Sequence, residues 1–280
     1  MAYNLNNKLV IAISSRALFD LEEENQIFEK DGLDAYYKYQ LENQDKSLKK
    51  GTGYRLVENI LKINSFFSSD ERQVEVIILS KNNAATSLRI TNAINDLKLD
   101  IIRSAWTSGT NISNYLKAFK VDLFLSADDN DVLNAIENGV AAAKILHSNE
   151  NIHNSSNNQV RIAFDGDAVL FSEESELVYK NHGLEAFIEH EKENRNNPLE
   201  MGPFAKLLLT IAKIQAKFPT DKSPIRTALV TARSAPTHER VIKTFNLWGV
   251  RVDEAFFLGG TDKYEILEAF GADIFFDDQD

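Results

Sequence analysis

The sequence repeats itself once along its length. When it is shifted by about 151 residues, residues 11–129 align with residues 162–280 without a gap. Roughly a quarter of about 120 aligned positions are identical, against about one in fifteen expected by chance, and this self-similarity indicates an internal duplication. We call residues 11–129 copy one and residues 162–280 copy two. Because similar sequences adopt the same fold, we predict that each copy forms one domain and that the two domains share one topology.

Both copies alternate short apolar runs with longer stretches of helical spacing. The runs are rich in β-branched residues and predict strands at residues 9–13, 74–79, 121–125, 161–164, 227–230 and 274–276. Between them, apolar residues recur three or four positions apart, for example at Leu207, Leu208 and Ile211. Buried continuous strands separated by helices are typical of parallel βαβ units. We therefore predict an α/β fold with two tandem Rossmann-like domains, each built on a parallel sheet.

Composition places the domain boundaries. Residues 1–147 contain copy one, and residues 161–280 contain copy two. The segment between them, residues 148–160, is dense in Asn and Ser, a composition that cannot build a core and is typical of a linker. In copy two, a polar insert of helical character at about residues 172–200 follows the first strand. It predicts a small cap over the mouth of the sheet.

Charge and cysteine content exclude several classes of function. The net charge of −11 argues against a nucleic-acid polymer as partner, because a phosphate backbone requires a basic face. A single small phosphorylated ligand stays compatible with that charge. The chain has no cysteine, so disulfides, thiolate catalysis and cysteine-ligated metals are excluded. No apolar run is long enough for a membrane helix or a signal peptide, so we expect a cytoplasmic protein without a membrane partner.

Acidic residues distinguish the two copies. Asp165 and Asp167 follow the first predicted strand of copy two, whereas Ser14 and Arg16 occupy the equivalent positions of copy one. An acidic pair at residues 277–278 follows the last predicted strand of copy two, where copy one has Ser and Ala. Copy one therefore lacks the groups that acid–base or metal chemistry needs. We expect copy one to act as a scaffold and copy two to be the reactive copy.

The polar residues of copy two are predicted to meet at one edge of its sheet. Ligands of open α/β sheets bind beyond the carboxyl ends of the strands. Asp165, Thr231 and Asp277 each follow such an end, and Lys263 lies in a turn before a predicted helix. Carboxylate clusters of this kind suit Mg²⁺, while the hydroxyl and the ammonium group would bind and neutralise a phosphoryl group.

Each of these residues also has an ordinary structural interpretation. The Asp-Gly pair at residues 165–166 is a common hairpin turn signal. Thr231 alone could be a helix N-cap, and Lys263 alone a solvated surface lysine. The acidic pair could be a solvated chain end, and Arg233 is either a surface residue or a contact to a phosphate or a base. Their joint occurrence in one order favours the functional interpretation.

The four segments, in this order, resemble the motifs of the haloacid-dehalogenase-like (HAD-like) phosphatase superfamily. That superfamily has an Asp-x-Asp motif, a Ser or Thr, a Lys and an acidic pair, which correspond here to residues 165–167, Thr231, Lys263 and residues 277–278. Longer segments, at residues 11–19, 163–172, 229–234 and 275–279, resemble the class I cytosolic 5'-nucleotidases. The resemblance covers both copies. It implies two HAD-like domains and Mg²⁺-dependent hydrolysis of nucleoside 5'-monophosphates.

The resemblance also implies a role for each matching residue. Asp165 would attack phosphorus and form an aspartyl phosphate, and Asp167 would protonate the leaving oxygen and later activate water. Mg²⁺ would be bound by Asp165, by Asp167 through its backbone carbonyl, and by Asp277, with Asp278 as a ligand or a hydrogen-bonded neighbour. Family members continue beyond the acidic pair, whereas this sequence ends at residue 280, and the missing segment would help to fix that pair.

Several alternatives stay open at the level of sequence. The same site could serve a phosphatase for another small phosphomonoester, because cap residues set specificity and cannot be interpreted from one sequence. The chain could also be a non-catalytic nucleotide-binding regulatory protein. In copy one, Ser14 and Arg16 are either part of a scaffold or an anion site for a substrate or effector nucleotide. Assembly into a homo-oligomer is likewise left open.

Overall fold

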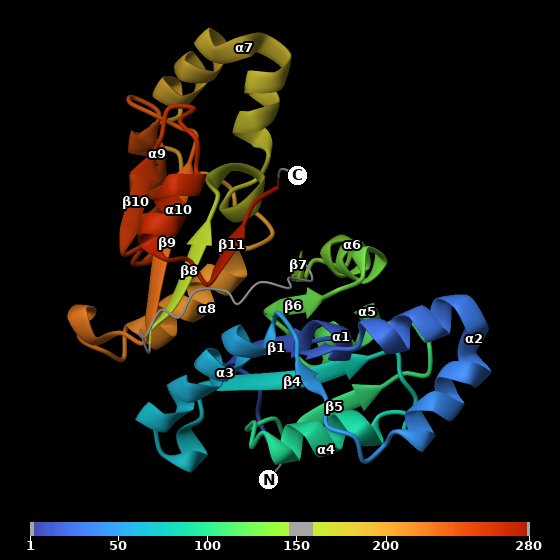
Figure 1. The fold of residues 1–280 in the computed structure, drawn as a ribbon. Helices are drawn as coiled ribbons and strands as arrows, with labels where there is room; N and C mark the ends of the chain where they lie inside the picture. The colour runs from blue at the N-terminus through green and yellow to red at the C-terminus, as the bar shows by residue number, and fades with distance from the viewer. Residues whose placement is uncertain (1–2, 146–158, 279–280) are drawn as a thin grey trace. The chain divides into compact units, whose positions relative to one another are not determined.

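The structure, a computed structural model, describes residues 3–145 and 159–278 (Figure 1). It divides into two compact units, Met1–Asn154 and Ser155–Asp280, here called the N-terminal and the C-terminal unit. Both are mixed α/β structures built on a parallel sheet. The predicted linker lies outside the described residues except for its last two positions. The second of these, Val160, already belongs to a strand, so the prediction of a linker through residue 160 was wrong at its end.

The N-terminal unit contains a five-stranded sheet of order β5-β4-β1-β6-β7, in which all neighbours are parallel. Its strands are β1 (Leu9–Ile13), β4 (Val74–Ser80), β5 (Arg103–Trp106), β6 (Leu123–Ser126) and β7 (Ala141–Lys144). Its α-helices are α1 (Ser15–Leu18), α2 (Glu22–Glu42), α3 (Tyr54–Lys62), α4 (Leu88–Asp96), α5 (Ser113–Ala118) and α6 (Asp129–Glu137). Two short strands, β2 (Phe19–Asp20) and β3 (Lys49–Lys50), form an antiparallel pair beside it.

The C-terminal unit contains a four-stranded parallel sheet of order β10-β9-β8-β11. Its strands are β8 (Val160–Phe164), β9 (Ile225–Thr231), β10 (Glu254–Phe257) and β11 (Ile274–Phe276). Its α-helices are α7 (Glu174–Glu193), α8 (Ala205–Gln215), α9 (His238–Trp248) and α10 (Tyr264–Phe270). A short π-helical turn, Gly166–Leu170, follows β8 directly. Helix α7 extends beyond the carboxyl ends of β8 and β9, where the sequence predicts a cap (Figure 1).

All six strands predicted from apolar runs are present, and the sheets contain others that the runs do not predict. Every residue of β1 and β4 is buried, as expected for central strands of a sheet covered by helices on both faces. The strands β5 and β10 are half-buried edge strands that were not predicted. The sequence of β5 contains no continuous apolar run of strand length, whereas β10 includes part of a short apolar run at residues 255–258 that the prediction did not include. The predicted strand at residues 121–125 begins two residues later, at Leu123.

Equivalent residues adopt equivalent conformations in the two units. The carboxylate of Asp122 accepts the backbone N–H of Val10 at 3.0 Å, and the carboxylate of Asp273 accepts that of Arg161 at 2.8 Å. In both cases a side chain before the last aligned strand fixes the start of the first one. Gly32 in α2 and Gly183 in α7 break their helices with nearly identical angles, φ 83° and 82°, a region that glycine enters without steric cost. In the described part of the chain, no helix is both long and apolar enough to cross a membrane.

Candidate active site

Asp165 lies at the carboxyl end of β8, where the buried strand gives way to a tight turn. Its side chain accepts the backbone N–H of Gly166 at 2.6 Å, and its own N–H donates to the carbonyl oxygen of Phe276 in β11 at 2.8 Å. The residue is only 6% exposed. The sheet thus fixes this carboxylate between the ends of two adjacent strands.

Lys263 connects two carboxylates that are far apart in the sequence. It precedes α10, and its Nζ donates to Asp165 Oδ2 at 2.7 Å and to Asp277 Oδ2 at 3.0 Å. Asp277 follows β11, which is the parallel neighbour of β8. The structure therefore brings together Asp165, Lys263 and Asp277, as the strand-end pattern predicts.

Three carboxylates form a cluster that suits a metal ion. Asp165, Asp277 and Asp278 each offer one oxygen, and these oxygens lie within 4.8 Å of one another. Hard divalent cations such as Mg²⁺ prefer oxygen ligands of this kind. Three of the four residues predicted at the metal site thus have their carboxylates gathered, and these fit the ion. The fourth, Asp167, is predicted to bind through its backbone carbonyl, and its side chain is not part of the cluster.

Burial controls the ionisation of this cluster. It raises the pKa of Asp165 to about 6, although the Lys263 ammonium opposes the shift. Burial also raises the pKa of Asp278, with a further contribution from the negative charge of Glu176. For Lys263, burial acts to lower the pKa, but its hydrogen bonds to Asp165 and Asp277 outweigh burial and raise it. One ammonium faces three acidic groups, so a bound cation would favour their ionised forms.

Asp167 is bound by an arginine. Arg233 donates from Nε to Asp167 Oδ2 at 2.8 Å and from Nη2 to Oδ1 at 2.6 Å, a bidentate pair. Such pairs are among the stronger ion pairs because two parallel hydrogen bonds fix their geometry. In this conformation the carboxylate points to Arg233, which lies two residues beyond the end of β9.

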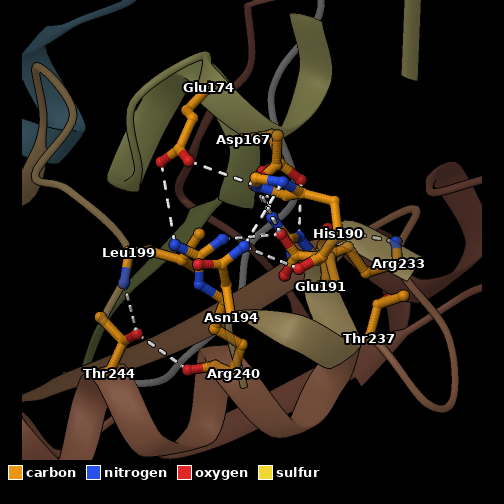
Figure 2. Close-up of polar contacts among 12 residues, drawn as sticks. Asp167, Glu174, His190, Glu191, Asn194, Leu199, Arg233, Thr237, Arg240 and Thr244 are labelled. Carbon is orange, nitrogen blue, oxygen red and sulfur yellow. Dashed lines mark hydrogen bonds and ion pairs between the residues drawn. The ribbon is translucent and has the colours of Figure 1, made fainter. Parts of the chain in front are cut away.

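Arg233 is itself part of a buried network that includes residues of helix α7 (Figure 2). Its Nη1 donates to Glu191 Oε2 at 2.5 Å, and Glu191 Oε1 accepts Arg240 Nη1 at 2.9 Å and the Ser175 hydroxyl at 2.8 Å. Glu191 and Arg233 are 2% and 4% exposed. Burial alone would raise the pKa of Glu191, but the charge of Arg233 and the hydrogen bond from Ser175 outweigh it and lower the pKa.

The sequence analysis does not identify Glu191 or Arg240. Helix α7 mixes polar and apolar residues without a clear apolar face, and a single buried glutamate within it has no distinguishing pattern. One signal was available: Arg240 is identical to its copy-one counterpart Arg89.

Thr231 ends β9 beside the turn that carries the first acidic motif. Its Oγ1 accepts the backbone N–H of Arg233 at 3.3 Å, and the residue is 1% exposed. A Cβ atom added to Gly166 would lie 3.2 Å from this oxygen, so the turn and the hydroxyl are in close contact. The structure thus places Thr231 at the same edge of the sheet as Asp165.

The equivalent residues of copy one make different contacts. Ser14 caps α1 by accepting the Ala17 N–H at 3.3 Å. Arg16 forms a bidentate pair with Glu22, at 2.7 Å from Nε and 2.8 Å from Nη2. The sequence suggests Arg16 as a binding site for an anionic ligand, but its guanidinium charge is already matched by the carboxylate of Glu22.

Comparison with known proteins identifies the family of this chain. A sequence model described as 5'-nucleotidase matches residues 1–280. The chain is 37% identical to human cytosolic 5'-nucleotidase 1B over 281 residues, which cover 97% of this chain and 46% of that protein. It thus spans about half the length of the curated relative it matches. On the strength of the match over its full length, this chain belongs to the 5'-nucleotidase family.

Proposed function

We propose that the chain hydrolyses nucleoside 5'-monophosphates to a nucleoside and phosphate, and that copy two carries the reaction. The observation that supports this most is the convergence of Asp165, Lys263 and Asp277 at the carboxyl ends of β8 and β11. Family membership and the resemblance to a cytosolic 5'-nucleotidase support the choice of substrate. The copy-one residues Ser14 and Arg16 lack the carboxylates for this chemistry.

We also propose that both units are HAD-like domains derived from one duplicated ancestor. The sheet order β10-β9-β8-β11 corresponds strand by strand to β5-β4-β1-β6. The shared helix break at Gly32 and Gly183 supports the same origin. In this scheme residues 1–147 form the non-catalytic domain, residues 161–280 the catalytic one, and α7 the main part of its cap.

The proposed reaction has two chemical steps. An Asp165 oxygen attacks phosphorus, the bond between phosphorus and the 5'-oxygen breaks, and Asp167 donates a proton to the departing oxygen. Water then attacks the aspartyl phosphate, gives its proton to Asp167 and releases phosphate. Lys263 and Thr231 bind the phosphoryl oxygens in both steps. Because both carboxylate oxygens of Asp167 accept hydrogen bonds from Arg233, Asp167 must separate from Arg233 before it can reach the departing oxygen.

Mg²⁺ fits the proposed site. Asp165, Asp277 and Asp278 would hold it together with the backbone carbonyl of Asp167. When bound, the ion reduces the repulsion between the attacking carboxylate and the phosphate dianion. We extend the family assignment to a cytoplasmic location and to a small nucleotide as the partner, without a nucleic-acid polymer or a membrane.

Phosphate release tests the proposal directly. We expect release from nucleoside 5'-monophosphates in Mg²⁺ and a loss of at least about 100-fold in EDTA, because the carboxylate cluster then faces the phosphate without a counter-ion. Sugar phosphates serve as the comparison panel. Faster release from sugar phosphates would assign a different phosphomonoester substrate. A folded protein that releases no phosphate from any of them would be a nucleotide-binding protein without turnover.

Metal affinity should depend on pH through Asp165. Its pKa is raised to about 6, so in the metal-free protein it takes up a proton as the pH falls through 6. A protonated carboxyl group does not bind Mg²⁺, so the dissociation constant should rise about tenfold per pH unit well below 6 and be nearly constant above 7. Calorimetric titration with Mg²⁺ from pH 5 to pH 8 measures this. In Asp165→Asn the break near pH 6 should disappear; an unchanged break would assign it to another group.

A further inference from the structure

The N-terminal unit contains a cavity at the position that corresponds to the acidic cluster of copy two. It has a volume of about 490 Å³, within the range of small-molecule sites. Ser14, Ser80 and Ser126 line it, and these align with Asp165, Thr231 and Asp277. Helix α2, which contributes Phe28 and Tyr36 to the wall, lies beyond the carboxyl ends of β4 and β5 (Figure 1). The duplicated fold has thus kept a pocket where copy one has lost the acids.

The charges around this cavity leave little attraction for an anion. The lining residues described include two cations, Arg16 and Lys81. Arg16 is held by Glu22, and Lys81 forms an ion pair with Asp131 at 2.6 Å. Three lining residues are acidic, so the wall carries more negative than positive charge. A phosphate dianion would have to displace a carboxylate from one of the cations, whereas an uncharged ligand would not.

A neutral hydrogen-bonded chain occupies the place of the Arg233–Glu191 ion pair of copy two, while Arg89, the counterpart of Arg240, is paired with Glu24. The Tyr36 hydroxyl donates to Asn82 Oδ1 at 2.6 Å and accepts Gln40 Nε2 at 3.0 Å. Asn82 and Gln40 align with Arg233 and Glu191, the ion pair that ties the cap of the C-terminal unit to its acidic motif. The Ser15 and Ser80 hydroxyls lie 3.0 Å apart beside this chain. Amides and hydroxyls both donate and accept, so this wall suits a ligand with neutral hydrogen-bonding groups.

Aromatic rings form another part of the wall. The centroids of Phe28 and Tyr36 lie 6.0 Å apart with the rings nearly perpendicular, at 80°. Phe28 is 48% exposed, so part of its ring is accessible to a ligand in the cavity. Aromatic side chains in such a position can stack on the flat face of a heterocycle.

We propose that this cavity binds an uncharged nucleoside, with the base against Phe28 and Tyr36 and the sugar hydroxyls at Ser15, Ser80 and Asn82. That the ligand is uncharged and contains a ring is inferred from the residues that line the cavity. Its identification as a nucleoside rests on the proposed function, since a nucleoside is the organic product of that reaction. Copy one would then be a second, non-catalytic site for the product of copy two.

Equilibrium binding to the full chain tests this proposal. The probes are adenosine, guanosine, cytidine and uridine, with AMP and inorganic phosphate as anionic comparisons, all in EDTA. We expect at least one nucleoside to show saturable binding that Phe28→Ala weakens about tenfold or more. AMP and phosphate, which can also bind at the proposed site of copy two, should show no binding component that Phe28→Ala weakens. Asn82→Ala is a second variant with the same expected direction. Tyr37→Ala is the matched control, because Tyr37 lies on the same helix and is 39% exposed but does not line the cavity.

Three results would overturn the proposal. The first is the lack of saturable nucleoside binding, and the second is nucleoside binding that Phe28→Ala and Asn82→Ala leave unchanged. The third is tighter binding of AMP or phosphate that is lost in Arg16→Gln, which would establish an anion site instead. Phosphate release by Phe28→Ala should equal that of the unmodified chain at low product concentration. If the chain releases no phosphate but still binds nucleosides through Phe28, the proposed function fails and this site stands.

Discussion

Phosphate release should fall by at least about 10⁴-fold when Asp165 is replaced by asparagine, with the fold intact. An amide oxygen cannot form the acyl phosphate. Removal of the nucleophile generally abolishes covalent hydrolysis and leaves only the small rate enhancement that substrate binding provides. The raised pKa of Asp165 means that its charged form is disfavoured in the metal-free fold. Because the pKa of Asp165 is higher in the folded than in the unfolded chain, its protonated form contributes fully to the stability of the fold only at a pH below the pKa of the unfolded chain. This contribution is lost as the pH rises through about 6, the pKa in the folded chain. At neutral pH we therefore expect no fall in the melting temperature of Asp165→Asn without metal.

Glu265→Gln is the matched control for this variant. Glu265 lies on α10 in the same unit, is exposed, and undergoes the same change from acid to amide. Its phosphate release and melting temperature should match those of the unmodified chain. Substantial residual hydrolysis by Asp165→Asn would contradict the assignment of Asp165 as the nucleophile.

Glu191→Gln should destabilise the C-terminal unit by about 3 kcal/mol, because it removes the charge that two buried guanidinium groups share. Arg233 would keep Asp167 as a partner, but the charge of Arg240 would be matched only by Glu174, at 3.8 Å, beside its hydrogen bond to the Asn197 carbonyl oxygen at 2.9 Å. Urea unfolding measured by circular dichroism gives the change in the free energy of unfolding. Residual phosphate release would show whether the loss of this pair also disturbs Asp167.

Two further variants make this result specific. Glu189→Gln changes an exposed glutamate on the same helix and should alter stability by no more than about 0.5 kcal/mol. In copy one, Arg89 is paired instead with Glu24, whose counterpart in copy two is Ser175. Adding Ser175→Glu to Glu191→Gln should therefore recover part of the lost stability. Equal effects of Glu191→Gln and Glu189→Gln would mean that the buried network does not stabilise the unit.

The part of the site at the strand ends could be predicted from the sequence. Parallel neighbouring strands end at the same edge, so Asp165 and Asp277 had to lie near each other once their strands were identified. The partner of Asp167 could not be predicted in this way. Its carboxylate points to Arg233, which is fixed by Glu191 on a helix whose sequence shows no buried face. Side-chain networks of this kind depend on packing that no periodic pattern records.

The same limit applies to the fold and to copy one. Fully buried strands were predicted because their residues are continuously apolar, whereas β5 was missed because it begins with the polar residues Arg103 and Ser104. The edge strand β10 was missed although three of its four residues are apolar, because its apolar run is short and follows two acidic residues. For Arg16, the sequence indicates a cation at the position of Asp167 but not its pairing with Glu22. That pair spans the short segment of α1 and β2, where no regular spacing predicts a contact.

Helix α7 cannot be replaced by another helix without regard to the charges beneath it. Its Glu191 balances Arg233 beside the sheet and Arg240 on α9, so the helix and its supports form one electrostatic unit. In a chimaera, a helix taken from a relative to replace α7 would therefore need a carboxylate at the position of Glu191. Without it, the buried charges of Arg233 and Arg240 would lose their shared partner, and both arginines would have to be replaced as well.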